Sequence, residues 1–376
     1  MTTETFEEKF MVNEKLRFTW LTASKTRAKF SRGFYRNAEL DLKLFEGVVS
    51  VEEAVVDFHK GKLNLITFSL YNRGDSAKIE ADEFKQRYMV TGKKMSKLLK
   101  SKPTSRKADK RQGLQTEGYS WSSRAGVALL EMNQGAMSGK GREFLRLRVA
   151  KKGAKGGLAA SMLSPRGGAS VRLSSLKNFV EEDKEGNIYV KGLPMVDQGG
   201  KGYCVVASVQ RLFEYYGVGA DMHQIDEIAE ADPEKGTSTY LMAKTLDKID
   251  YRFKTRLKII AMSSESGALV EIDENKGEYY VGDKLEKRKV FKAIRTSIDD
   301  GLPLLWSLEL GKYPEVPDLS PQTSGGHMRL IIGYNDKEET IIFSDSWGKG
   351  HEFKTMKMSH VYSATHGLFT LKPTVN

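Results

Sequence analysis

A stretch of twenty residues without an acidic side chain divides the sequence in two. Residues 151–170 read KKGAKGGLAASMLSPRGGAS and are rich in glycine, alanine and serine, which is the composition of a flexible linker. The whole chain has 376 residues, a length that commonly corresponds to two domains. We therefore predict one domain over residues 1–150, a linker over 151–170 and a second domain over 171–376.

Charge is distributed unevenly along the chain. Residues 1–170 contain 33 lysines and arginines against 18 aspartates and glutamates, whereas residues 171–376 contain 27 against 31. A basic balance favours anionic partners. The basic stretches 93–111 and 140–155 could contact a nucleic acid or another anionic surface. The more common role of such stretches is to form a solvated surface, and we favour that interpretation. The first of them is also predicted to be an exposed, mobile connection.

Several classes of protein are excluded by composition. No apolar run approaches the ~20 residues of a bilayer span, so no membrane span is expected. The first ten residues lack the features of a signal peptide, so we expect a cytoplasmic protein, or an exported one whose leader is absent from this chain. Cys204 is the only cysteine and no HExxH spacing occurs, so we expect no disulfide, no metal site and no cofactor.

Periodicity in the first domain indicates a mixture of strands and helices. Two runs rich in β-forming residues, 49–58 and 63–71, are joined by a short polar link and predict a hairpin. Helical spacing follows over 80–99, and strand-like runs follow over 125–132 and 144–150. The prediction for this domain is a small basic α+β fold.

The second domain shows helices first and strands later. Helical patterns cover 205–216, 222–229, 240–249 and 287–298, and strand patterns cover 257–262, 268–272, 302–308, 328–334 and 340–344. This order predicts an α+β domain with a helical half and an antiparallel sheet half. The loop over 311–325 contains several prolines and is expected to border a cleft.

Cys204 lies at the predicted start of a helix, after a glycine-rich turn over 199–203. The start of a helix carries a partial positive charge and unpaired N–H groups, both of which favour a thiolate over a thiol. A lone cysteine in an apolar helix is more often a buried small side chain. Its role therefore depends on whether suitable partners occur elsewhere in the chain.

Three other residues supply such partners. His327 begins a strand and can shuttle the thiol proton. The next strand ends just before Asp345, so antiparallel pairing brings this carboxylate beside His327, where it can orient the imidazole. Gln198 lies six residues before Cys204 and can donate its amide to a developing oxyanion.

This set of residues resembles the papain-like cysteine peptidases over about residues 190–350. Gln198, Cys204, His327 and the run 345–348 (DSWG) occur in the order of the branch that processes bacteriocins by cutting after double-glycine leaders. The resemblance implies that Cys204 is the nucleophile and His327 the general base and acid. It also implies that Asp345 orients His327, and that Gln198 and the Cys204 N–H form the oxyanion hole. Papain itself has asparagine where Asp345 stands, although aspartate is usual in the leader-peptidase branch.

The residues around this set are expected to contact a peptide or protein substrate. They are Gly202, Tyr203, Gly326 and Trp347. Trp347 is further expected to shield the pair formed by His327 and Asp345 from water. The glycine pairs 156–157 and 167–168 raise the idea that the linker is self-processed, but ordinary linker composition explains them more simply.

The prediction is a papain-like α+β domain preceded by a smaller basic α+β domain, acting as a cysteine peptidase through a thioester acyl-enzyme. Two alternatives use the same residues. One is a catalytically silent module that binds peptides, and the other is a transglutaminase-like acyl transferase in which an amine replaces water.

Overall fold

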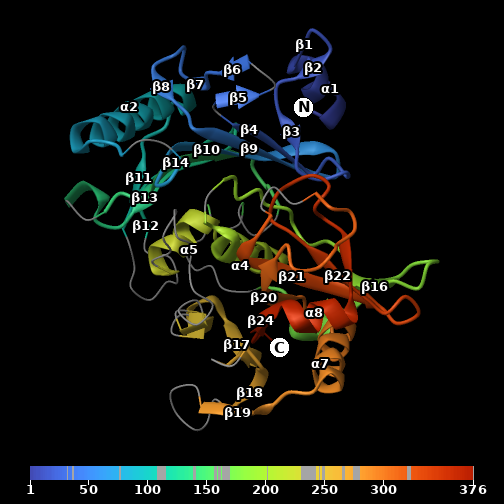
Figure 1. Ribbon diagram of the computed structural model, residues 1–376. Helices are drawn as coiled ribbons and strands as arrows, with labels where there is room; N and C mark the ends of the chain where they lie inside the picture. The colour runs from blue at the N-terminus through green and yellow to red at the C-terminus, as the bar shows by residue number, and fades with distance from the viewer. Residues whose placement is uncertain are drawn as a thin grey trace. The chain divides into compact units, whose positions relative to one another are not determined.

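Figure 1 shows the computed structural model of the chain. It describes residues 1–375 except 32, 36–37, 76–77, 108–115, 139–140, 156–158, 160–161, 163–169, 201, 230–242, 245, 248–249, 265–266, 274–279 and 320–322. Most of the predicted linker, both of its glycine pairs and much of the predicted helix 240–249 lie outside the described residues. The chain divides into two compact units, one comprising Met1–Gly167 with Gly219–Glu234 and the other comprising Gly168–Val218 with Lys235–Asn376.

The first unit is built around an eight-stranded antiparallel sheet with the order β11-β12-β13-β14-β10-β9-β4-β3. Its elements are α1 (Thr3–Lys9), β1 (Met11–Val12), β2 (Lys15–Leu16), β3 (Thr19–Trp20), β4 (Arg27–Ser31), β5 (Gly33–Tyr35), β6 (Ala38–Leu40), β7 (Lys43–Leu44), β8 (Val49–Ser50), β9 (Glu53–His59), β10 (Lys62–Asn72), α2 (Ala81–Leu99), β11 (Thr104–Arg106), β12 (Thr116–Ser122), β13 (Val127–Asn133), the 3-10 helix η1 (Ala136–Ser138), β14 (Phe144–Ala150) and α5 (Met222–Ala229).

Apolar spacing explains why α2 packs on this sheet. Phe84, Tyr88 and Met95 lie on one side of the helix and are buried against Leu130 and other sheet residues. The predicted hairpin is formed by β9 and β10. One expectation was wrong in part, because β11 lies within the stretch predicted as a mobile connection and pairs with β12 at the edge of the sheet.

Charged residues attach Gly219–Glu234 to the first unit, although the sequence places this segment in the second predicted domain. Asp221 forms an ion pair with Arg146 of β14, and Asp226 accepts a hydrogen bond of 2.9 Å from Arg73. Arg146 also pairs with Glu131, and both side chains are buried. Periodicity identifies the helix α5 but carries no information about the unit on which that helix packs.

The second unit contains a ten-stranded sheet in which β15-β16-β21-β20-β24-β17-β18-β19 run side by side, and β22 pairs with both β21 and β23. Its elements are the 3-10 helix η2 (Leu173–Phe179), β15 (Val180–Glu182), β16 (Ile188–Val190), α4 (Cys204–Tyr215), the 3-10 helix η3 (Asp250–Phe253), β17 (Thr255–Ser263), β18 (Leu269–Asp273), β19 (Tyr280–Lys284), α7 (Lys287–Asp299), β20 (Leu304–Leu310), β21 (Gly325–Asn335), β22 (Thr340–Ser344), β23 (Lys354–Lys357), α8 (Met358–Ala364) and β24 (Thr365–Pro373).

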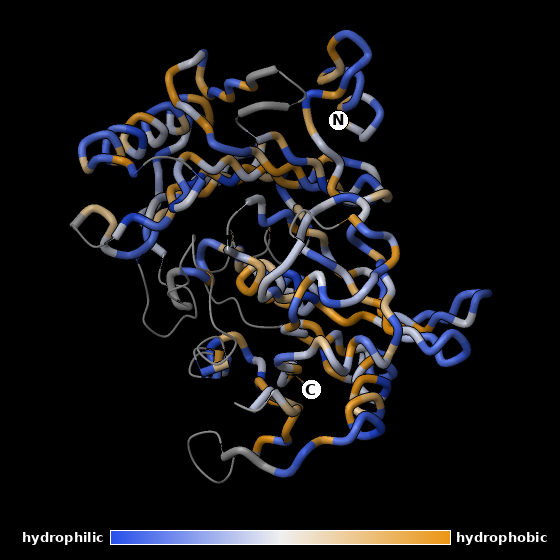
Figure 2. The backbone as a smooth tube through the Cα atoms, viewed as in Figure 1, coloured by the Kyte–Doolittle hydropathy of each residue, from blue (hydrophilic) through white to orange (hydrophobic). Residues whose placement is uncertain are grey.

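Helices cover both faces of this sheet. Figure 1 shows α4 on one side of β20, β21 and β24, and α7 and α8 on the other. α4 is buried almost all round, whereas Figure 2 shows apolar and polar residues alternating along α7, as expected for a helix with one face on a sheet. Both units therefore combine helices with antiparallel strands, and the predicted α+β class is confirmed. Among the described residues, no helix combines the length and the apolarity needed to cross a bilayer.

Candidate active site

Cys204 is the first residue of α4, and Tyr203 is its N-cap. The cysteine is partly exposed, whereas the residues that follow it in the helix are buried. Burial by itself raises the pKa of the Cys204 thiol. A hydrogen bond from His327, the charge of that imidazole and the backbone N–H groups of Met328 and Val205 outweigh this effect, so the pKa of the thiol is lowered.

His327 lies near the start of β21 and is 4% exposed. Its Nε2 is 2.9 Å from Oδ1 of Asp345, which leaves Nδ1 to face the thiol of Cys204. Burial by itself lowers the pKa of the imidazole, but the hydrogen bonds to Asp345 and Cys204 raise it above its usual value. A lowered thiol pKa and a raised imidazole pKa together favour a thiolate paired with an imidazolium.

Asp345 follows the last residue of β22 and is fully buried. Leu330 of β21 lies opposite Ser344, and continuing this register by one residue brings Asp345 beside Arg329, with His327 two residues further along the same face of β21. Burial by itself raises the pKa of the Asp345 carboxyl, but the Arg329 guanidinium and the hydrogen bond from His327 hold it well below its usual range. The carboxylate is therefore ionised beside the imidazole.

Trp347 covers the imidazole of His327. The two rings are stacked, with their centroids 4.3 Å apart and their planes at 11°. Asp197 pairs with Trp347 as an isolated antiparallel bridge, which ties the segment before Cys204 to the segment after β22. The stacked indole covers one face of the imidazole ring.

Gln198 is held in one orientation by Ser346. The backbone N–H of Gln198 donates to the Ser346 carbonyl at 2.8 Å, and the Ser346 hydroxyl donates to Oε1 of Gln198 at 2.6 Å. Both side chains are buried. Because Oε1 is engaged as an acceptor, the amide is fixed with its NH₂ group on the other side.

Asp345 belongs to a cluster of four buried or nearly buried charged residues, of which the other three were not predicted from the sequence. Arg329 donates to Asp345 at 2.8 Å and to Glu315 at 2.5 Å. Lys354 donates to Glu315 at 2.5 Å and lies 3.6 Å from Oδ2 of Asp345. Two carboxylates and two cations thus balance one another in the interior. A signal was present in the sequence, since Arg329 lies two residues after His327 in an otherwise apolar strand and therefore on the same face.

Arg211 is a further residue of the site that was not predicted from the sequence. It lies seven residues after Cys204, on the same side of α4, and is buried. Its guanidinium donates to the carbonyls of Pro194 and Asp345, at 2.8 Å each, and to the hydroxyl of Ser344 at 2.6 Å. This one side chain joins the helix of Cys204 to the segments that carry Gln198 and Asp345.

The remaining predicted residues lie around these groups. The Tyr203 side chain is fully buried, Gly202 is partly exposed and Gly326 is exposed. In the loop predicted to border the cleft, Glu315 pairs with the buried cations and Val316 bonds to Thr355 through both backbone groups, at 2.8 and 2.9 Å. Within the described ranges, no group of three or more His, Cys, Asp and Glu is arranged to hold a metal ion.

A family model described as the Peptidase C39 like family matches residues 190–368. No curated protein matches the chain. The crystal structure of xylellain, a cysteine protease from Xylella fastidiosa, is similar at 11% sequence identity with a TM-score of 0.30, covering 56% of this chain and 92% of xylellain. The family match spans the range predicted from the motifs, and confirms that this part of the chain resembles the papain-like cysteine peptidases.

Proposed function

We propose that the second unit is a cysteine peptidase in which Cys204, His327 and Asp345 form the catalytic triad. The observation that carries the proposal is the arrangement of the three side chains: Nε2 of His327 lies 2.9 Å from Oδ1 of Asp345, and the imidazole is hydrogen-bonded to the Cys204 thiol at the start of α4. The pKa of the thiol is lowered and that of the imidazole raised, as expected for such a pair. A thiolate is a far better nucleophile than a thiol, and the imidazolium beside it is ready to give up a proton. The similarity of residues 190–368 to a peptidase family supports a peptide or protein as the substrate.

The reaction proceeds in two halves. The Cys204 sulfur attacks the carbonyl carbon of a peptide bond, and the carbonyl oxygen becomes an oxyanion. The His327 imidazolium donates its proton to the leaving nitrogen, the C–N bond breaks, and a thioester remains on Cys204. His327 then accepts a proton from water, the resulting hydroxide attacks the thioester, and the C–S bond breaks to release the acid and the thiolate.

The other groups stabilise charge and orientation. The Gln198 amide and the Cys204 backbone N–H are the proposed donors to the oxyanion, and the hydrogen bond from Ser346 holds the amide in place for this task. Asp345 keeps Nε2 of His327 occupied, so that Nδ1 faces the sulfur. Gly202 and Gly326 are proposed to let the substrate backbone approach closely.

The test is hydrolysis of a mixture of unfolded peptides, followed by mass spectrometry. Cys204→Ala and His327→Ala should abolish cleavage while the melting temperature shows that the protein is folded. The matched control is His366→Ala, because His366 is partly exposed and pairs only with Glu309 among its described contacts. Cleavage by the Cys204→Ala protein at the rate of the wild type would refute the proposal.

The same protein samples discriminate the two alternatives. A silent peptide-binding module would leave Cys204 no more reactive toward iodoacetamide than free cysteine. An acyl transferase would give products whose mass includes an added amine, whereas hydrolysis gives free acids in the presence or absence of that amine.

A further inference from the structure

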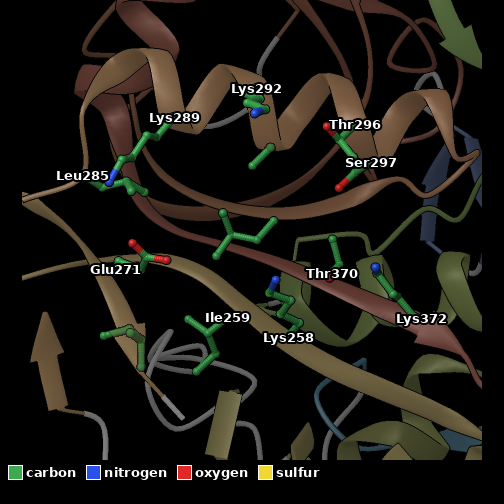
Figure 3. A pocket seen from close by; sticks show the side chains of 13 residues that line it. Lys258, Ile259, Glu271, Leu285, Lys289, Lys292, Thr296, Ser297, Thr370 and Lys372 are labelled. Atoms are coloured by element: carbon green, nitrogen blue, oxygen red, sulfur yellow. The ribbon is translucent and has the colours of Figure 1, made fainter. Parts of the chain in front are cut away.

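A cavity of about 530 Å³ lies in the second unit, between α7 and the strands β17, β18 and β24 (Figure 3). This volume falls within the ~300–1,000 Å³ typical of small-molecule sites. The described lining comes from the strand residues, from Leu285 and from five positions on one side of α7. The cavity is therefore framed by regular secondary structure on both sides.

The cavity is separate from the proposed catalytic site. Thr370 of β24 lines the cavity and pairs with Leu304 of β20, whereas His327 pairs with Leu308 of β20. Four residues along a strand correspond to about 13 Å, and β20 lies between β24 and β21. A ligand in the cavity would not contact the reacting atoms.

Positive charge dominates the lining. Lys258 and Lys372 come from neighbouring strands, Lys289 and Lys292 come from α7, and Glu271 is the single acidic residue in the described lining. Figure 3 shows the first two side chains beside the cavity on the sheet and the other two on the helix above it. None of these four ammonium groups forms an ion pair or a hydrogen bond with another residue in the described part of the chain. Like charges around one cavity favour an anion within it.

One end of the cavity also has a polar group without a partner. Thr370 is 2% exposed, and its hydroxyl makes no hydrogen bond to any described residue. Thr370 lies directly opposite Lys258 in the sheet, and Lys372 lies two residues further along β24 on the same face. Two lysine side chains and a hydroxyl thus lie on one face of two adjacent strands. They match the two oxygens of a carboxylate, which together accept several hydrogen bonds.

Apolar side chains and the one acidic residue of the described lining lie elsewhere in the cavity. Ile259, Ile272 and Leu285 line it and are themselves buried. Glu271 and Lys289 lie near Leu285, away from Lys372 and Thr370 (Figure 3). Because Glu271 repels an anion, the charged group of a ligand is favoured at the end that contains Lys258 and Lys372.

We propose that this cavity binds a carboxylate with an apolar body, whose charged group lies between Lys258, Lys372 and the Thr370 hydroxyl and whose apolar part contacts Ile272 and Leu285. The site is additional to the proposed peptidase site. Its occupancy does not depend on catalysis, so it is testable in a protein that cannot cleave peptides.

The experiment measures binding of decanoate to the full-length Cys204→Ala protein by isothermal titration calorimetry. We expect one site per chain. Acetate keeps the charge without the apolar body and decanol keeps the body without the charge, so each should bind at least about tenfold more weakly than decanoate. Equal binding of decanol and decanoate, or no decanoate binding at all, would overturn the proposal.

Variants locate the site. The double charge reversal Lys258→Glu with Lys372→Glu should weaken decanoate binding by about tenfold or more, and Thr370→Val should weaken it several-fold at nearly constant side-chain volume. The matched control is Lys93→Glu with Lys97→Glu, which reverses two exposed charges on α2 of the other unit. If both double variants bind decanoate equally, the cavity is not the site. Hydrolysis by the wild-type protein, measured separately, keeps this result distinct from the outcome of the peptidase test.

Discussion

Arg329 donates a hydrogen bond to the same Asp345 oxygen that is bonded to His327. The distances to Oδ1 are 2.8 Å from Nε of Arg329 and 2.9 Å from Nε2 of His327. Arg329 and His327 are two residues apart on β21, so the pleat of one strand presents both side chains to the carboxylate. The charge that acts on the imidazole is therefore that of a carboxylate already paired with a guanidinium.

Replacing Arg329 by methionine should shift the pH profile of activity. The variant removes a cation near Asp345 and leaves more net negative charge beside the imidazole, so the pKa of His327 should rise further. The alkaline limb of kcat/KM, which reports loss of the imidazolium, should move to higher pH. Unfolding should become easier by about 3–5 kcal/mol, because two carboxylates lose a buried partner.

Arg329→Lys is the control for this prediction, since it keeps the charge but not the planar fork. Its alkaline limb should stay closer to that of the wild type. An unchanged alkaline limb in a folded Arg329→Met protein would show that the guanidinium does not act on His327.

Replacing Asp345 by asparagine should move the alkaline limb of the kcat/KM profile to lower pH. The amide keeps the shape of the side chain and removes the negative charge that supports the imidazolium, so the pKa of His327 should fall. Arg329 and Lys354 would lose the carboxylate of Asp345 and keep their ion pairs with Glu315, and the free energy of unfolding should decrease by about 3–5 kcal/mol. Chemical denaturation and a pH–rate profile check the two effects independently, and an upward shift of the limb would contradict the assignment.

The pH dependence of thiol alkylation tests the ion pair directly. With the pKa of Cys204 lowered and that of His327 raised, the thiolate should exist between these two values, and iodoacetamide should react well below the ~8.5 of a free cysteine. In His327→Ala the lowering contributions of the imidazole are lost and burial remains, so the reactive pH range should move upward. Identical alkylation profiles for the two proteins would rule out the pairing.

Gln198 and Ser346 should differ in the size of their effects. Gln198→Ala removes a proposed oxyanion donor and should lower kcat by ~10²–10³ with little change in KM. Ser346→Ala keeps the Gln198 amide but removes the hydrogen bond that holds its Oε1, so the fall in kcat should be smaller than for Gln198→Ala. Steady-state kinetics on one peptide substrate measure both, and a larger loss for Ser346→Ala would reverse the proposed order of roles.

Much of the second unit was predictable from local pattern. Helical periodicity after a glycine-rich turn identified the helix that begins at Cys204, and two apolar runs around a short turn identified β21 and β22. Once these elements are known, antiparallel pairing is enough to bring Asp345 to His327. Both inferences depend on residues close together in the chain, where backbone geometry links sequence spacing to spatial position.

Other features were decided by contacts between distant segments. β24, which lies between β20 and β17 in the sheet, was not predicted from the sequence, and the α5 segment was predicted in the other domain. The roles of Arg211, which joins three segments of the site, and of the cluster formed by Arg329, Glu315 and Lys354 were not predicted either. A periodic pattern states which face of an element is apolar, but not which element meets that face. A buried charge is stable only beside partners from elsewhere in the chain, and tertiary packing alone brings those partners together.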